Sequence, residues 1–232
     1  MSKAVLISIN PEWCDLILRG DKTAEVRKTR PKLETPFKVY IYCTKAPQHL
    51  ITIFKDGEKT MDGEIHQGKP KFLKCGKYLP DGIRDKTQMV IGEFTCSYIA
   101  PIFRSASWNP GEPAKMYARC ADGHCQKGYT DQLLKDACLN KGDIEKYFSG
   151  LNGLVGYGWR ISDLKIYDKP KALSSFSKHG FSSLFGLNIC GNDSCEYYKS
   201  SGNHIVPPTC AVDGCCLKRP PQSWCYVEEL YT

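Results

Sequence analysis

The chain has 232 residues, of which 41% are hydrophobic and 25% charged, and its formal net charge is +7. These values are ordinary for a soluble globular protein, and no apolar run approaches the roughly 20 residues that a membrane-spanning helix needs. The length fits one large domain or a domain with an appended module, and the basic excess favours a polyanionic partner such as RNA without requiring one.

The first 28 residues predict a strand, a short helix and a second strand. Residues 3–9 alternate and are rich in β-branched side chains, which indicates a strand. Asn10 then suits the N-cap of a helix and Pro11 its first turn, and the helix is expected to end at Gly20. The segment 22–27 therefore emerges as a strand directly after a capped helix.

Further elements follow in order along the chain. Residues 37–43 and 89–96 are rich in aromatic and β-branched residues and predict strands. Gly, Lys and Asp in residues 55–88 indicate turns and short hairpins, with no sign of whether they cover a cleft. We expect two short helices in 129–148, broken at Lys141–Gly142, then one or two strands in 154–167. A last strand is expected at 223–228.

The segment Gly20 to Arg27 carries the pattern Gly-x-Lys-x-x-Glu-x-Arg. Strand alternation sends Ala24 and Val26 to the core and groups polar side chains on the other face, with Lys22 at its edge: Thr23, Glu25 and Arg27. Arginine suits carbonyl or phosphate oxygens, glutamate accepts from exocyclic amines, and a desolvated lysine can act as a base. The alternative is a set of surface ion pairs with no role beyond satisfying the end of the sheet.

These residues resemble a known family. The run 7–28 is similar to the opening of an ASCH domain, and the match to that family's Gly-x-Lys-x-x-Glu-x-Arg signature is complete. Residues 90–94 resemble a later strand of the family. Residues 156–167 and 219–227 resemble bacterial and phage members in particular.

The resemblance implies an α+β fold, with a small PUA-like β-barrel, flanking helices and a cleft beside the motif. We expect the barrel in residues 1–169, with insertions near 55–88 and 104–150, and a returning strand in 222–232. The ligand-binding residues expected from the resemblance and the motif are Gly20, Lys22, Thr23, Glu25, Arg27, Trp159 and Arg160.

Family members are regarded as RNA-associated, so the leading hypothesis is a protein that binds RNA or a modified nucleobase or nucleotide. The alternative is an amidohydrolase that deacylates a cytidine-type nucleoside, with Lys22 and Glu25 as catalytic residues. The threonine of those small hydrolases falls at Glu25, and their downstream carboxylate has only rough candidates here: Asp131, Asp136 and Glu145. A ribonuclease and a phage accessory protein that sequesters a nucleotide remain further alternatives.

Residues 170–221 are rich in Ser, Gly, Pro and Cys and poor in periodic apolar positions. Because no export signal opens the chain, we expect a cytoplasmic, reducing location in which its 13 cysteines stay free or bind metal. Paired thiols at this spacing fit a structural zinc site that would fold the segment, with these ligands: Cys190, Cys195, Cys210 and Cys215. Cys216 or His204 could replace one ligand, and a second, incomplete candidate lies at Cys120 and Cys125.

Overall fold

A computed structural model describes residues 3–46, 48–60, 62–76, 79–105, 115–120, 123–124, 128–178, 181–184, 187–190, 198–199, 209–210 and 215–230. The helices are α1 (Pro11–Leu18), α2 (Asp81–Arg84), α3 (Tyr129–Asp136) and α4 (Lys141–Tyr147), with a 3₁₀ turn at Leu173–Ser175. The strands of the main sheet are β1 (Lys3–Ile9), β2 (Ala24–Arg27), β3 (Phe37–Cys43), β6 (Val90–Ser105), β7 (Lys115–Ala118), β8 (Gly153–Lys171) and β13 (Trp224–Glu228). Two smaller sheets hold β4 (Gln48–Phe54), β5 (Lys71–Gly76), β9 (Phe181–Leu184), β10 (Leu187–Cys190), β11 (Tyr198–Lys199) and β12 (Thr209–Cys210).

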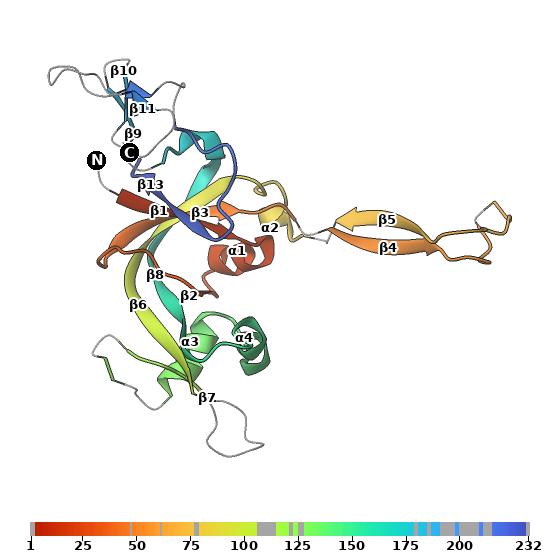
Figure 1. Ribbon diagram of the computed structural model, residues 1–232, viewed down its shortest axis with the longest axis horizontal. Coiled ribbons are helices and arrows are strands. Elements are labelled where there is room, and N and C mark those ends of the chain that lie inside the picture. The colour runs from red at the N-terminus through yellow and green to blue at the C-terminus, as the bar shows by residue number, and fades with distance from the viewer. Residues whose placement is uncertain are drawn as a thin grey trace.

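The main sheet is mixed and runs in the order β13-β1-β3-β6-β8-β2, with β7 added to β6. β1 and β3 are parallel, because α1 and β2 lie between them in the chain, and the other neighbours are antiparallel. β6 and β8 lie side by side through the body of the molecule (Figure 1). Four register shifts interrupt their pairing, and such irregularities bend a sheet and increase its twist.

The curled sheet does not close into the expected barrel. In the part of the chain that the structure describes, β2 has β8 as its only strand partner. Side chains bridge the remaining gap instead: Trp224 Nε1 donates to Thr29 Oγ1 over 3.0 Å, and Arg27 Nη2 donates to the carbonyl oxygen of Ser8 over 2.5 Å. A seam therefore remains between the four-residue strand β2 and the end of β1.

Two apolar clusters hold the helices against this sheet. The first lies under α1 and α2 and includes Ile17, Ile83 and the fully buried Trp159. The second joins α3 and α4 to β2, β6 and β8, and its largest buried side chain is Phe148. Helices α3 and α4 are therefore fixed beside the motif strand, although more than 100 residues separate them from it in the chain.

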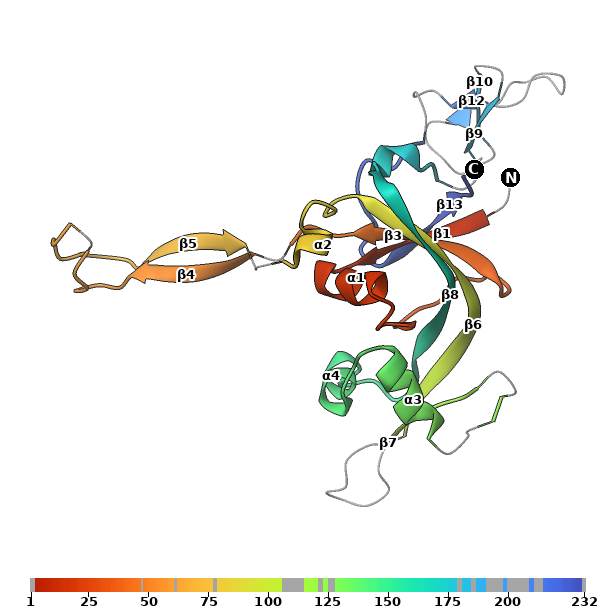
Figure 2. The same cartoon turned by 180° about the vertical axis from the view of Figure 1, so that it is seen from behind.

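The structure corrects two expected boundaries. The break between α3 and α4 lies at residues 137–140 and not at Lys141–Gly142, because Asn140 forms a capping box with Asp143 and starts α4. The hairpin expected within residues 55–88 begins earlier, since Gln48–Phe54 forms β4 and pairs with β5. This hairpin projects away from the body in both views and does not cover the motif (Figures 1 and 2).

The expected strand at residues 223–228 is observed as β13, which pairs antiparallel with β1 from Lys3 to Ile7. Residues 154–167 lie within one continuous strand, β8, which extends to Lys171. Among the described residues, no helix is both long and apolar enough to span a membrane.

Candidate functional site

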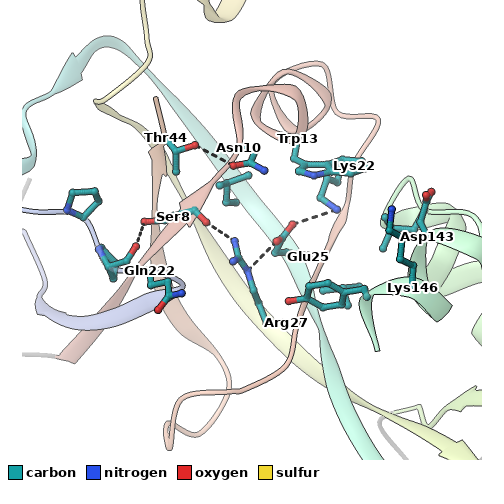
Figure 3. A pocket seen from close by; sticks show the side chains of 16 residues that line it. Ser8, Asn10, Trp13, Lys22, Glu25, Arg27, Thr44, Asp143, Lys146 and Gln222 are labelled. Carbon is teal, nitrogen blue, oxygen red and sulfur yellow. Dashed lines mark hydrogen bonds and ion pairs between the residues drawn. The ribbon is translucent and has the colours of Figure 1, made fainter. Parts of the chain in front are cut away.

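A cavity of about 660 Å³ lies at the seam between β2 and the end of β1. Its walls come from β1, α1, β2, α4 and the segment before β13. It is lined by Ser8, Ile9, Asn10, Trp13, Lys22, Glu25, Val26, Arg27, Thr44, Leu139, Asp143, Lys146, Tyr147, Pro220, Pro221 and Gln222 (Figure 3). The volume falls in the range of small-molecule and cofactor sites, about 300–1,000 Å³.

Local sequence explains how the motif reaches this cavity. Gly20 takes a φ of +78°, a conformation that a side chain would strain, so the chain can turn sharply after α1. The amides of Asp21 and Lys22 both donate to the carbonyl oxygen of Leu16, which ends the helix. The chain then enters β2, whose pairing with β8 runs from Ala24 to Arg27.

Lys22, Glu25 and Arg27 form a continuous buried ion-pair chain. Lys22 Nζ lies 3.2 Å from Glu25 Oε2, and Arg27 Nε lies 3.0 Å from Glu25 Oε1. The three side chains are only 3%, 8% and 13% exposed. These ion pairs are therefore buried and not exposed at the surface, and burial reduces the solvent screening that makes surface pairs weak.

The ammonium nitrogen of Lys22 has three close neighbours. Besides Glu25, Nζ donates to the carbonyl oxygen of Ala137 over 2.7 Å and lies 5.0 Å from the centre of the Trp13 ring. An ammonium group has three donors and no acceptor. Lys22 is thus held as a fixed charge in the wall of the cavity.

Arg27 keeps more of its donors open. Its Nε faces Glu25 at ion-pair distance without good hydrogen-bond geometry, and Nη2 donates to the carbonyl oxygen of Ser8. Among the described residues, no acceptor is recorded for Nη1. Because a guanidinium has five donors in a planar fork, Arg27 retains donors for a ligand in the cavity.

The rim opposite β1 belongs to α4. Asp143, Lys146 and Tyr147 all line the cavity from this helix, and Figure 3 shows Asp143 and Lys146 across from Glu25 and Arg27. Burial raises the pKa of the Tyr147 phenol, and the positive charge of Arg27 opposes this shift. The ring is 42% exposed and carries the ammonium group of Lys28 at 5.0 Å. Tyr147 therefore presents an aromatic surface at the mouth of the site.

The structure brings only part of the predicted site together. Lys22, Glu25 and Arg27 line the cavity, whereas Gly20, Thr23, Trp159 and Arg160 do not. Gly20 acts on the backbone turn, and Thr23 exchanges backbone hydrogen bonds with Asp136 and Ile161.

Trp159 and Arg160 are occupied elsewhere. Trp159 is fully buried between the rings of Phe37 and Trp224, so the expectation that it contacts a ligand is wrong for this conformation. Arg160 pairs with Asp136 on the outside of the second cluster. Their place in the sequence favours a position beside the cleft. The pairing of β8 with its neighbouring strands instead directs both side chains away from it.

Several lining residues were not predicted as site residues. Trp13, Lys146 and Tyr147 are among them, and no local signal in the sequence marks Tyr147 or Lys146. The rough carboxylate candidates Asp131, Asp136 and Glu145 do not line the cavity; Asp143 does. Only the long-range packing of α4 against β2 reveals this acid.

The predicted zinc ligands fall mostly outside the described part of the chain. Cys195 and the alternative His204 lie outside it, as does Cys125 of the second candidate, and of Cys190 and Cys210 only the backbone is described. That backbone places Cys190 and Cys210 on neighbouring strands, which pair at Ile189 and Thr209. In the described residues no group of three or more His, Cys, Asp or Glu side chains is positioned to hold a metal, so the zinc site stays a prediction.

Two solved ASCH structures are similar to this chain. The crystal structure of ASCH from Zymomonas mobilis shares 15% identity at a TM-score of 0.41, and the match covers 73% of each chain. A mutant of that ASCH protein shares 16% identity at a TM-score of 0.40, covering 74% of this chain and 77% of that one. No family model matches the chain, and no curated protein matches it. Likeness at this level assigns neither a ligand nor an activity.

Proposed function

We propose that this protein binds a nucleobase-containing ligand, RNA or a modified nucleoside or nucleotide, in the cavity at the seam. One observation carries the proposal: the three charged residues of the motif lie together in the wall of a cavity of about 660 Å³. A nucleobase needs a polar edge to pair with and an apolar face to stack on. The cavity offers both.

The polar edge is the ion-pair chain. Arg27 has donors left for a carbonyl oxygen, and Asn10, Thr44 and Gln222 add neutral polar groups to the lining. These groups are fixed before a ligand arrives, because Glu25 holds Arg27 in place and Thr44 Oγ1 donates to Asn10 Oδ1 over 3.2 Å. A preorganised site avoids the cost of ordering side chains on binding.

The apolar surface comes from Trp13 and Tyr147, which line the cavity from α1 and α4. Stacking of a base on an aromatic ring contributes about 1–3 kcal/mol and tolerates any base, since each has a π-face. The formal charge of +7 favours approach of a polyanion such as RNA. The ASCH-like signature adds the expectation of an RNA-associated ligand.

A hydrolytic role has less support. Lys22 would need a free amine to act as a base, and its Nζ is engaged with Ala137, Glu25 and the Trp13 ring. We therefore propose binding and not catalysis for this site.

Isothermal titration calorimetry with cytidine, N4-acetylcytidine, adenosine and short single-stranded RNA tests the proposal. Arg27→Met should weaken binding of the best ligand by at least tenfold, since it removes the open donors. The matched control is Arg30→Met, which changes an exposed arginine that does not line the cavity. Unchanged affinity in Arg27→Met, or equal losses in both variants, would mean that the ligand binds elsewhere.

A further inference from the structure

The charges that line the cavity do not balance. Among the described residues, Glu25 is the carboxylate in contact with both Lys22 and Arg27, and all three side chains are at least 87% buried. Buried charges in proteins are normally paired, because an uncompensated one loses hydration without gaining a partner. The chain Lys22–Glu25–Arg27 therefore leaves one positive charge in the wall.

The rim of the cavity does not cancel this excess, because it adds one acid and one cation. Asp143 is the other acid in the lining, and its carboxylate accepts from the backbone amide of Asn140 in the capping box of α4. Lys146, one helical turn further, is the third cation of the lining, after Lys22 and Arg27. The lining as a whole keeps an excess of positive charge.

Donor geometry points to the same kind of ligand. Arg27 retains donors at Nη1 in a planar fork, which matches the oxygens of a phosphate better than a single carbonyl oxygen. Lys22 lies behind Glu25 with its donors engaged, so it adds positive potential without competing for the ligand. Arg27 is therefore the residue placed to contact an anionic group.

We propose that the cavity holds a phosphoryl group against Arg27, so that its ligand is a phosphorylated nucleotide and not a neutral nucleoside. This inference rests on the proposed function and narrows it. Two sources share this chemistry: the phosphate of a free mononucleotide, and a terminal phosphate of an RNA chain. The volume of about 660 Å³ has room for a base, a sugar and a phosphate together.

The test compares the affinities of cytidine, its 5′- and 3′-monophosphates and inorganic phosphate at low salt, by calorimetry on the full chain. We expect a monophosphate to bind at least tenfold more tightly than cytidine, with the difference shrinking as salt screens the charge. Arg27→Met should abolish this difference, and Arg30→Met should keep it. A short RNA with and without a terminal phosphate then separates the two sources.

A measurement on the unmodified protein covers the case in which Arg27→Met does not fold. A phosphomonoester gains its second negative charge near pH 6. Affinity for the monophosphate should therefore rise from pH 5 to 7.5, relative to that for cytidine at the same pH.

The outcomes separate the two proposals. Equal affinity for cytidine and its monophosphates overturns the phosphoryl site and leaves the nucleobase site standing. If inorganic phosphate binds as tightly as the monophosphates, the phosphoryl site is supported. The base then adds nothing to the affinity, which overturns the nucleobase site. Absence of binding by any of these compounds or by the RNAs overturns both.

Discussion

Lys22 and Ala137 are joined by a hydrogen bond of 2.7 Å from Nζ to the main-chain carbonyl oxygen, although 115 residues separate them in the chain. Ala137 is the C-cap residue that directly follows α3. The bond therefore ties the motif to the turn that leads into α4, the helix that carries the rim of the cavity. A lysine in this position organises the site as well as charging it.

The first prediction ranks two variants of the ion-pair chain by how much each lowers the stability of the protein. Glu25→Gln leaves Lys22 and Arg27 buried without an anion between them, and should lower the free energy of unfolding by about 3–5 kcal/mol. Lys22→Met keeps the Glu25–Arg27 pair and loses mainly the bond to Ala137, so about 2 kcal/mol is expected.

Urea-induced unfolding followed by circular dichroism measures both losses. Lys32→Met changes an exposed lysine close to the motif in sequence and should stay within about 0.5 kcal/mol of the parent protein. A smaller loss for Glu25→Gln than for Lys22→Met would contradict the role of Glu25 as the shared anion.

The second prediction concerns the spacing between β8 and α4. A Cβ at Gly156 would lie 2.4 Å from the Phe148 ring and 2.8 Å from the carbonyl oxygen of Arg27, and Phe148 is fully buried. Gly156→Ala must therefore push Phe148 and the end of α4 outward, at a cost of about 1–3 kcal/mol. Because Tyr147 and Lys146 move with that helix, ligand affinity should fall as well.

Gly158→Ala is the matched control for this variant. The three atoms nearest to its Cβ would all belong to the Leu133 side chain, the closest at 2.7 Å, and Leu133 belongs to α3 and does not line the cavity. Thermal unfolding and ligand titration should show a stability loss in both variants, and a loss of affinity in Gly156→Ala alone. If Gly156→Ala binds the ligand with normal affinity, the position of α4 does not contribute to ligand binding.

The third prediction is a fall in stability at alkaline pH. Burial raises the pKa of the Cys96 thiol from its ordinary 9.0 to about 12. The thiol therefore makes its full contribution to the free energy of unfolding below pH 9, where it is protonated in both the folded and the unfolded state. That contribution is lost as pH rises toward 12, because the thiol ionises in the unfolded chain while it stays protonated in the folded protein. The expected slope is about 1.4 kcal/mol per pH unit above pH 9.

Denaturation curves at pH 8.5, 9.25 and 10 measure this slope. Burial also raises the pKa of Cys14 and of Cys225, so the parent protein should lose stability through several thiols in this window. Cys96→Ala should flatten the slope by the share of one thiol. An identical slope in that variant would show that Cys96 does not ionise as its burial requires.

Local patterns predicted the elements better than the site. Alternation placed Ala24 and Val26 in the core and Glu25 and Arg27 on the opposite side, and the structure agrees because β2 is a short strand with one apolar face. Asn10, Pro11 and Gly20 similarly bounded α1. Each of these features depends on residues within one turn or one strand of each other.

What depends on distant packing was missed or misplaced. Trp159 is among the ligand-binding residues expected from the resemblance, yet the pairing of β8 with β2 and β6 encloses it between other rings. Tyr147 and Asp143 belong to a helix about 120 residues from the motif, so nothing in their own neighbourhood indicates a ligand. The failure of the sheet to close is equally non-local, since it depends on which strands pair across the whole sheet.

The open seam has a consequence for what the cavity can recognise. In the described part of the chain, β2 pairs with β8 along one edge, and Val26 of β2 lines the cavity. A strand edge without a neighbouring strand leaves room for another group beside it. In a closed barrel another strand would fill the space beside β2, whereas at the open seam that space is available to a ligand.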